Sequence, residues 1–295
     1  MKFYRHYWIY FIVSAFFILP GLWSLFNHGL KLGIDFTGGS LLTISANEAT
    51  QAALLTETQV RQLAGNDFNL ASVKMTSDEQ VILRLSPLTN EEKNQLLAQI
   101  SQTIPVTQVS FDSVGATLGQ ELIKKTTYAI ILASIILVLY LKYRFKEFSF
   151  GVAAFIGVIH DVLIICGIFS ILGWLYQVEI DTLFVTALLT TISFSVHDTV
   201  VIYDRIHELR QKFPKSSLRD VSQAAVTATI SRSFNNSLTV FFMLLALLVL
   251  GGVTLRYFAL ALLLGVFFGT YSSPFNSIPL LLLAEDKKWF VRKRK

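Results

Sequence analysis

The chain is poor in cysteine and in charge. Its 295 residues include a single cysteine, Cys166, so a disulfide within the chain is excluded. Cys166 lies in an apolar run, where we expect it to be a small buried hydrophobic residue. Only 15% of the residues are charged and 53% are hydrophobic, whereas soluble domains carry about 25% charged residues. The shortage of charge predicts a polytopic α-helical membrane protein.

Enzyme motifs are also missing from the sequence. It holds no pair of nucleophile and base, no cluster of metal ligands and no phosphate-binding loop, and Gly38-Gly39 lacks the lysine and the helix of a P-loop. We therefore expect no catalytic activity, no metal and no cofactor. The net charge of +5 does not indicate a nucleic-acid partner, because no basic segment alternates with aromatic residues on a folded platform.

Six apolar stretches are long enough to cross a bilayer, which takes about 20 residues of helix. We expect the first to be retained as a span rather than cleaved as a signal peptide. Its apolar region is too long for a signal peptide, and Pro20-Gly21 is followed by large residues. The predicted spans are residues 7–27, 125–141, 149–173, 182–204, 232–252 and 257–283.

Lysine and arginine are concentrated in the loops on one side of these spans, which is typical of the cytoplasmic side. The two short loops on the other side, 176–181 and 251–256, hold only Arg256. We therefore predict that both termini are cytoplasmic and that residues 33–120 lie outside. The basic segments would set this topology and contact membrane lipids. They contain Lys2, Arg5, Lys142, Arg144, Lys146, Arg205, Arg210, Lys212, Lys215, Arg219 and the basic residues of 287–295.

The segment between the first two spans alternates between strand-like and helical patterns. Capping boxes at 56–59 and 89–92 predict the starts of two helices. The resulting order, β-α-β-β-α-β, is that of the ferredoxin-like motif. The expected strands are 40–45, 73–75, 81–85 and 106–114, with a turn at 76–80.

These patterns divide the chain into four parts. Residues 1–32 hold the first span and the start of the outer loop, and residues 33–120 form an α+β outer domain. Residues 121–283 form a five-helix membrane bundle, and residues 284–295 a basic cytoplasmic tail. With one six-helix set and no internal repeat, the chain is expected to be half of a pseudo-symmetric transporter whose other half is a second polypeptide.

Polar clusters interrupt the fourth and fifth spans. An ionisable residue inside a bilayer is costly and is usually functional, with a partner nearby. Asp198 and Arg232 would lie at about the same depth on antiparallel neighbouring helices. We predict that they couple the movement of protons or ions, with Arg232 pairing with the ionised carboxylate. Each lies on a face of helical spacing that should point into the bundle: Thr191, Ser195 and Asp198 on one span, and Arg232, Asn235, Asn236 and Thr239 on the other.

Other interpretations of these residues stay open. A static buried ion pair could fix the register of the two helices instead. His160 and Asp161, in the middle of the third span, are either a proton relay or a hydrogen bond between helices. His197 projects about 100° away from Asp198. The residues assigned to relay or polar packing are His160, Asp161, Ser195, His197, Asn235 and Asn236.

Small and polar residues also interrupt the sixth span. Gly265 and Gly269 have the spacing of close helix packing. Beyond them, helix-breaking and polar residues predict a kink or a bend beside a cavity. These residues are Ser272, Ser273, Pro274, Asn276 and Pro279.

Four segments resemble the SecD/SecF family of accessory subunits at the bacterial Sec protein-export channel, and among them the SecF type. The six spans and the large outer segment match as well, so the resemblance covers nearly the whole chain. The signature residues of the first segment are Gly33, Asp35, Gly38 and Gly39, for which we expect a tight turn. The segments are LGIDFTGG at 32–39, SFSVHDTVVIYDR at 193–205, HDVLI at 160–164 and SRS at 231–233, the last followed by Asn235, Asn236 and Thr239.

The resemblance implies the fold of resistance-nodulation-division exporters in the bacterial plasma membrane, with SecD supplying the second six-helix half. It implies the SecYEG channel and a translocating unfolded preprotein as further partners. It also implies that Asp198 and Arg232 take part in proton passage, and that a proton or sodium gradient helps to pull the exported chain outward.

Two other functions compete with this one. The first is a proton-coupled exporter of small molecules or lipids on the same fold. The second is an assembly or scaffold subunit that transports nothing. The scaffold hypothesis predicts that Asp198→Asn and Arg232→Lys are tolerated, whereas truncation of the outer domain is not.

Overall fold

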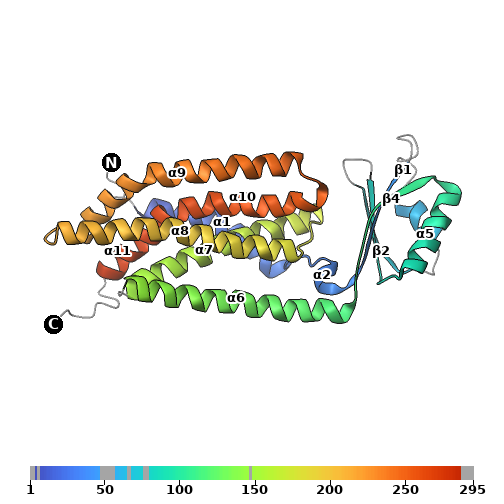
Figure 1. Cartoon of the computed structure of the whole chain (residues 1–295), viewed down its shortest axis with the longest axis horizontal. Helices are drawn as coiled ribbons and strands as arrows, with labels where there is room; N and C mark the ends of the chain where they lie inside the picture. The colour runs from blue at the N-terminus through green and yellow to red at the C-terminus, as the bar shows by residue number, and fades with distance from the viewer. Residues whose placement is uncertain are drawn as a thin grey trace. The chain divides into compact units, whose positions relative to one another are not determined.

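The computed structural model describes residues 4, 7–46, 57–64, 68–75, 80–145 and 148–286 (Figure 1). The chain divides into two compact units. Met1–Lys31 and Ala129–Lys295 form one unit, which we call the membrane unit, and Leu32–Tyr128 form the other, which we call the outer unit after its predicted location.

Within the described residues, six helices are long and apolar enough to cross a membrane, which confirms the six predicted spans. Several of them run further than predicted, α8 and α9 among them. α8 continues to Lys212 and α9 begins at Leu218, where the Ser217 hydroxyl accepts from the Asp220 amide at 3.1 Å. Polar ends of a helix can lie in water and still complete their backbone hydrogen bonds. The first five spans are α1 (Trp8–Asn27), α6 (Ala116–Phe145), α7 (Phe148–Tyr176), α8 (Thr182–Lys212) and α9 (Leu218–Leu250).

The sixth span is interrupted, as predicted. α10 (Val253–Ser272) passes through a five-residue π-helix, η2 (Ser273–Ser277), into α11 (Ile278–Asp286). Pro274 lies in this segment and has no N–H to donate to the preceding turn, and a wider π turn accommodates such a break. The Tyr4 hydroxyl donates to the Pro274 carbonyl at 3.1 Å.

The helices of the membrane unit differ in burial. In their most apolar stretches, 56% of α7 is buried, whereas none of α6 and only 6% of α9 is. Glycines bring the central helices close together. A Cβ on Gly21 of α1 would lie 2.8 Å from the Gly167 Cα on α7, and a Cβ on Gly269 would lie 3.3 Å from the Ser195 Cα. The predicted close packing at Gly269 is therefore confirmed, and its neighbour is α8.

The outer unit is an antiparallel sheet with the strand order β2-β3-β1-β4, which confirms the ferredoxin-like prediction. Side chains of β1 and β3 pack on α4 and α5, as Leu42, Leu83 and Leu96 illustrate; all three are fully buried. The elements are α2 (Ile34–Thr37), β1 (Gly39–Ala46), α4 (Glu57–Ala64), β2 (Leu70–Met75), β3 (Gln80–Leu85), α5 (Asn90–Thr103) and β4 (Val106–Val114).

The capping box at the start of α5 is confirmed. The Glu92 carboxylate accepts from the Thr89 amide at 2.8 Å, and the Thr89 hydroxyl accepts from the Glu92 amide. The hydrogen bond from the Thr89 backbone lowers the pKa of Glu92. Part of the other predicted box, at 56–59, and most of the predicted turn at 76–80 lie outside the described residues, as does most of the basic tail.

A turn joins α2 to β1. Gly38 has φ 74° and Gly39 has φ 133°, in the region that favours glycine. A Cβ on Gly39 would also lie 2.9 Å from the Leu85 carbonyl oxygen. Arg84 steadies the turn by donating to the Thr37 hydroxyl at 2.9 Å and to the Leu32 carbonyl at 3.3 Å.

Candidate functional site

The polar residues of α8 form one buried face, as their spacing predicted. Thr191 and Ser195 are each 1% exposed and Asp198 is 7% exposed. Gly265 and Gly269 of α10 lie against Thr191 and Ser195. Because these glycines have no side chain, α10 approaches closely enough to place its own hydroxyls beside α8.

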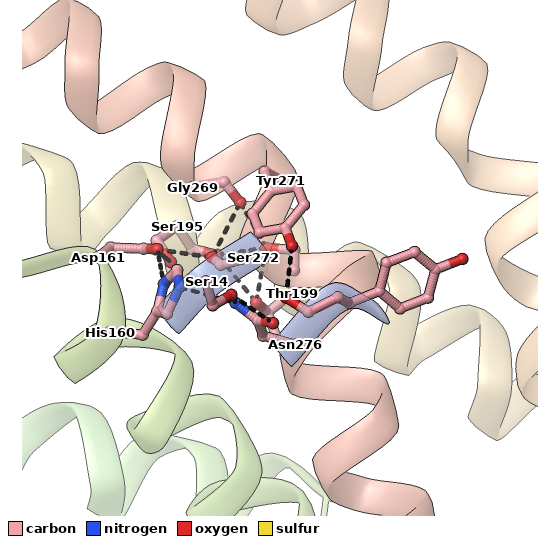
Figure 2. Close-up of polar contacts among 11 residues, drawn as sticks. Ser14, His160, Asp161, Ser195, Thr199, Gly269, Tyr271, Ser272 and Asn276 are labelled. Carbon is pink, nitrogen blue, oxygen red and sulfur yellow. Dashed lines mark hydrogen bonds and ion pairs between the residues drawn. The ribbon is translucent and has the colours of Figure 1, made fainter. Parts of the chain in front are cut away.

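Asp161 lies at the centre of a buried polar cluster and is 1% exposed (Figure 2). Its Oδ2 accepts from the Ser195 hydroxyl at 2.6 Å and from the Ser272 hydroxyl at 2.7 Å. Its Oδ1 lies 2.9 Å from Nδ1 of His160. One carboxylate therefore joins α7, α8 and the end of α10.

The cluster continues on the other side of His160. Nε2 of His160 lies 2.9 Å from Nδ2 of Asn276 in η2, and the Asn276 amide contacts the Ser14 hydroxyl on α1 at 2.9 Å. Figure 2 shows Asp161 and Asn276 on opposite sides of the His160 ring. We call the set the buried polar cluster; it comprises Ser14, His160, Asp161, Ser195, Thr199, Ser272, Ser273 and Asn276.

The π-helix completes this cluster. The Ser273 hydroxyl lies 2.8 Å from the Thr199 hydroxyl and 3.1 Å from the Ser195 carbonyl oxygen. Thr199 also donates to that carbonyl, at 3.0 Å. Ser195 thus contacts Asp161 through its side chain and the η2 segment through its backbone. A shift of α8 would therefore change its contacts with both.

Asp198 lies in a different environment, beside an apolar cavity of about 430 Å³ between α8, α9 and the α10–η2 segment. The side chains of Ser233 and Thr270 line the same cavity as its carboxylate. Thr270 in turn donates to the Ser237 hydroxyl at 2.6 Å. Aromatic residues supply much of the remaining wall: Phe234, Phe241, Phe267, Tyr271 and Phe275.

The prediction that the α9 polar face points into the bundle is wrong for this chain. Arg232 and Asn235 are exposed, and within the described residues no direct ion pair joins Arg232 to Asp198. The polar positions of α9 that line the cavity are Thr229, Ser233 and Ser237. Leucine and phenylalanine cover both sides of α9, so hydrophobicity does not distinguish its lipid face from its bundle face.

The remaining predicted residues divide between the two sites. Asn236 is exposed but lines a small space of about 10 Å³ beside Asp198, which His197 also lines. His197 itself is exposed, consistent with its projection away from Asp198. The signature residues Gly33, Asp35, Gly38 and Gly39 belong to the outer unit.

Sequence reasoning missed the part played by Ser14 and assigned Asn276 only to a kink. Both are buried, at 5% and 2% exposure, within apolar helices. The available signal was their polarity inside a span, since buried polar groups in lipid need partners. The partner is not readable from the sequence, because 262 positions separate the two residues.

Comparison with known proteins defines the family. The family model described as "Protein export membrane protein SecD/SecF, C-terminal" matches residues 93–287, and the SecD/SecF GG motif matches residues 23–50. The chain belongs to the SecD/SecF family. This SecD/SecF chain is 38% identical to the protein translocase subunit SecF of Anaerolinea thermophila, over 96% of its length and 93% of the relative. It is 39% identical to the SecF of Thermobaculum terrenum, over 96% and 93%.

The fold of this SecD/SecF chain is also similar to a crystal structure of SecDF, a translocon-associated membrane protein from Thermus thermophilus. The TM-score is 0.82 at 30% identity. The match covers 96% of this chain but only 39% of the SecDF chain. The match to SecDF confirms the predicted resistance-nodulation-division type of half bundle. The six apolar helices and the family make this a multi-pass membrane protein.

Proposed function

We propose that the chain is an accessory membrane subunit of the Sec protein-export machinery, and that Asp198 couples export to the movement of ions. The observation that carries the proposal is the place of Asp198 in a SecD/SecF fold. It is a buried carboxylate at the wall of a cavity inside the membrane unit. A carboxylate there is costly, and ionisable residues in such places are usually functional.

The proposal includes a second subunit. Arg232 and Asn235 lie on an exposed face of α9 within a predicted span, and a charged residue in contact with lipid tails is unfavourable. This protein matches 39% of the SecDF chain, so most of SecDF lies outside the match. A separate SecD polypeptide would cover the exposed face of α9 and move Arg232 into a protein environment, where it pairs with Asp198 in one state of the cycle.

The orientation that we propose rests on the charge distribution of the loops. We place both termini in the cytoplasm and residues 33–120 outside the plasma membrane. The outer unit would contact the unfolded preprotein as it leaves the SecYEG channel, and a proton or sodium gradient acting at Asp198 would drive the movement. Support for this topology comes from the basic loops on the opposite side of the spans.

The test is export of a secreted reporter in bacteria depleted of their own SecF and supplied with this chain together with its SecD. Wild type, Asp198→Asn and Arg232→Lys are compared at matched membrane levels. The matched control is Asp204→Asn, because Asp204 is on the same helix but pairs with Arg144 at the surface, at 2.7 Å. We expect export with wild type and the control, and at least a tenfold loss with the other two variants.

Two results would redirect the assignment. Equal export by all four proteins would favour a scaffold subunit, in which Asp198 only packs. Failure of wild type, although both subunits are present in the membrane, would contradict the export function and leave a proton-coupled exporter of small molecules as the next candidate.

A further inference from the structure

The hydrogen bonds around His160 define where its proton lies. Nδ2 of an asparagine amide donates and cannot accept. It faces Nε2 of His160 at 2.9 Å, so Nε2 accepts. The imidazole proton is then on Nδ1, which donates to Oδ1 of Asp161 at 2.9 Å. In this arrangement His160 is neutral and both ring nitrogens are satisfied.

Adding a proton to His160 would conflict with this arrangement. A protonated imidazole donates from both nitrogens, so Nε2–H would face the Nδ2 donor of Asn276. Turning the Asn276 amide by half a revolution replaces Nδ2 by Oδ1 and removes the conflict. The neighbour on the far side can follow, because the Ser14 hydroxyl both donates and accepts.

We propose that His160 is a second proton-binding site of the membrane unit, and that the Asn276 side-chain amide turns with its protonation state. The two states are both fully hydrogen-bonded and differ by one proton and one amide orientation. In the protonated state the imidazolium and the Asp161 carboxylate, 2.9 Å apart, form a neutral pair. The three donors to Asp161 stabilise the other state, in which the carboxylate is the single charge.

Other ionisable groups lie on the helices around this site. On α10 the Tyr271 ring centre lies 6.4 Å from that of His160, and its hydroxyl donates to the Tyr10 backbone on α1. On α8 Asp198 lines the neighbouring cavity, and His197 is exposed. The ionisable group in direct contact with the imidazole is the carboxylate of Asp161.

The cluster would carry the change to two other helices. Ser14 connects the amide to α1. Asp161 connects the ring to Ser195 on α8, and the Ser195 carbonyl accepts from Thr199, the residue after Asp198. These hydrogen bonds link His160 to the segment of α8 that carries Asp198. The inference concerns the imidazole itself and stands whether or not the proposed export function holds.

The experiment is nitrogen NMR of the full chain in lipid nanodiscs, with ¹⁵N-labelled histidine and asparagine. The chain has five histidines, so His160→Gln assigns the signals by difference. At high pH we expect the Nδ1–H form of His160 and a correlation across the hydrogen bond from Asn276 Nδ2 to His160 Nε2. As the pH falls, the ring should become doubly protonated and the correlation should vanish at the same midpoint.

Asn276→Asp sharpens the test, since it places only acceptors opposite Nε2. We expect the midpoint of His160 protonation to rise by at least about one pH unit, a tenfold change in proton affinity. The matched control, Asn235→Asp on the exposed face of α9, should leave it unchanged. A neutral His160 protonated on Nε2 would overturn the proposal. So would a ring that stays neutral from about pH 9 to pH 4, or a correlation to Asn276 that survives protonation.

Discussion

The two polar faces of the membrane unit contrast sharply. Where α7 and α8 meet, polar side chains hydrogen-bond to one another: both oxygens of Asp161 have partners, and the carboxylate is 1% exposed. On α9 the polar residues Arg232 and Asn235 are exposed. One chain thus holds a buried polar cluster whose members hydrogen-bond to one another, and a polar face that is exposed. The difference separates the polar residues that serve this bundle from those for which we propose an interface with another subunit.

The largest expected effect comes from replacing Asp161, the centre of the buried polar cluster. Asp161→Ala leaves the donors on Ser195 and His160 buried without their acceptor, at about 1–3 kcal/mol each, so we expect a loss of about 2–6 kcal/mol in the free energy of unfolding. Arg232→Ala removes an exposed charge and should change it by less than about 0.5 kcal/mol in the isolated chain. Reversible unfolding of the purified chain in mixed micelles measures both. Equal losses would erase the contrast between the two faces.

A smaller effect is expected where α10 contacts α8. Gly265 lies against Thr191, and a Cβ there would overlap the threonine side chain. Gly265→Ala should therefore separate the helices and cost about 1–3 kcal/mol. Gly252→Ala is the control, because a Cβ at Gly252 has no atom within 4 Å. The same unfolding titration applies, and a Gly265 variant as stable as the control would show that this close packing is not needed.

The smallest effect is expected on the exposed polar face of α9, which carries Arg232 and Asn235 and which we call the open face. Asn235→Leu replaces an exposed polar side chain by one that suits lipid, so the isolated chain should change by less than about 0.5 kcal/mol in stability. When SecD is co-purified with the chain, however, the variant should recover less SecD per chain than wild type. If the isolated chain were strongly destabilised instead, Asn235 would belong to the bundle and the open face would have to be redrawn.

Regular periodicity explains what the sequence could predict. The outer unit alternates with a period of two in its strands and carries a capping box at Thr89, so its elements and strand order were predictable. On α8, the spacing of Thr191, Ser195 and Asp198 identified the buried face. Both cases rest on one side of an element differing in polarity from the other.

The predictions that failed or were missed concern membrane helices. There, a side that faces lipid is as apolar as a side that faces the bundle. On α9 both sides are apolar, so the orientation of Arg232 depended on which neighbours the helix packs against. The contact of Ser14 with Asn276 depends on α1 returning beside the sixth span, and no local pattern specifies it. Glycines gave a better guide, because Gly269 indicated a close neighbour even before that neighbour was known to be α8.

The π-helix of Ser273–Ser277 also has a consequence for how the gene can change. A π turn is the form that an α-helix takes when it absorbs one extra residue. Loss of a single codon within this segment would let the turn revert to an α-helix and leave α10 and α11 in nearly the same relative orientation, because a π turn absorbs its extra residue locally. The side chains inside the turn, among them the amide at 276, would shift around the helix although no side chain of the cluster had been replaced. The length of this segment, as much as its composition, is therefore expected to be under selection.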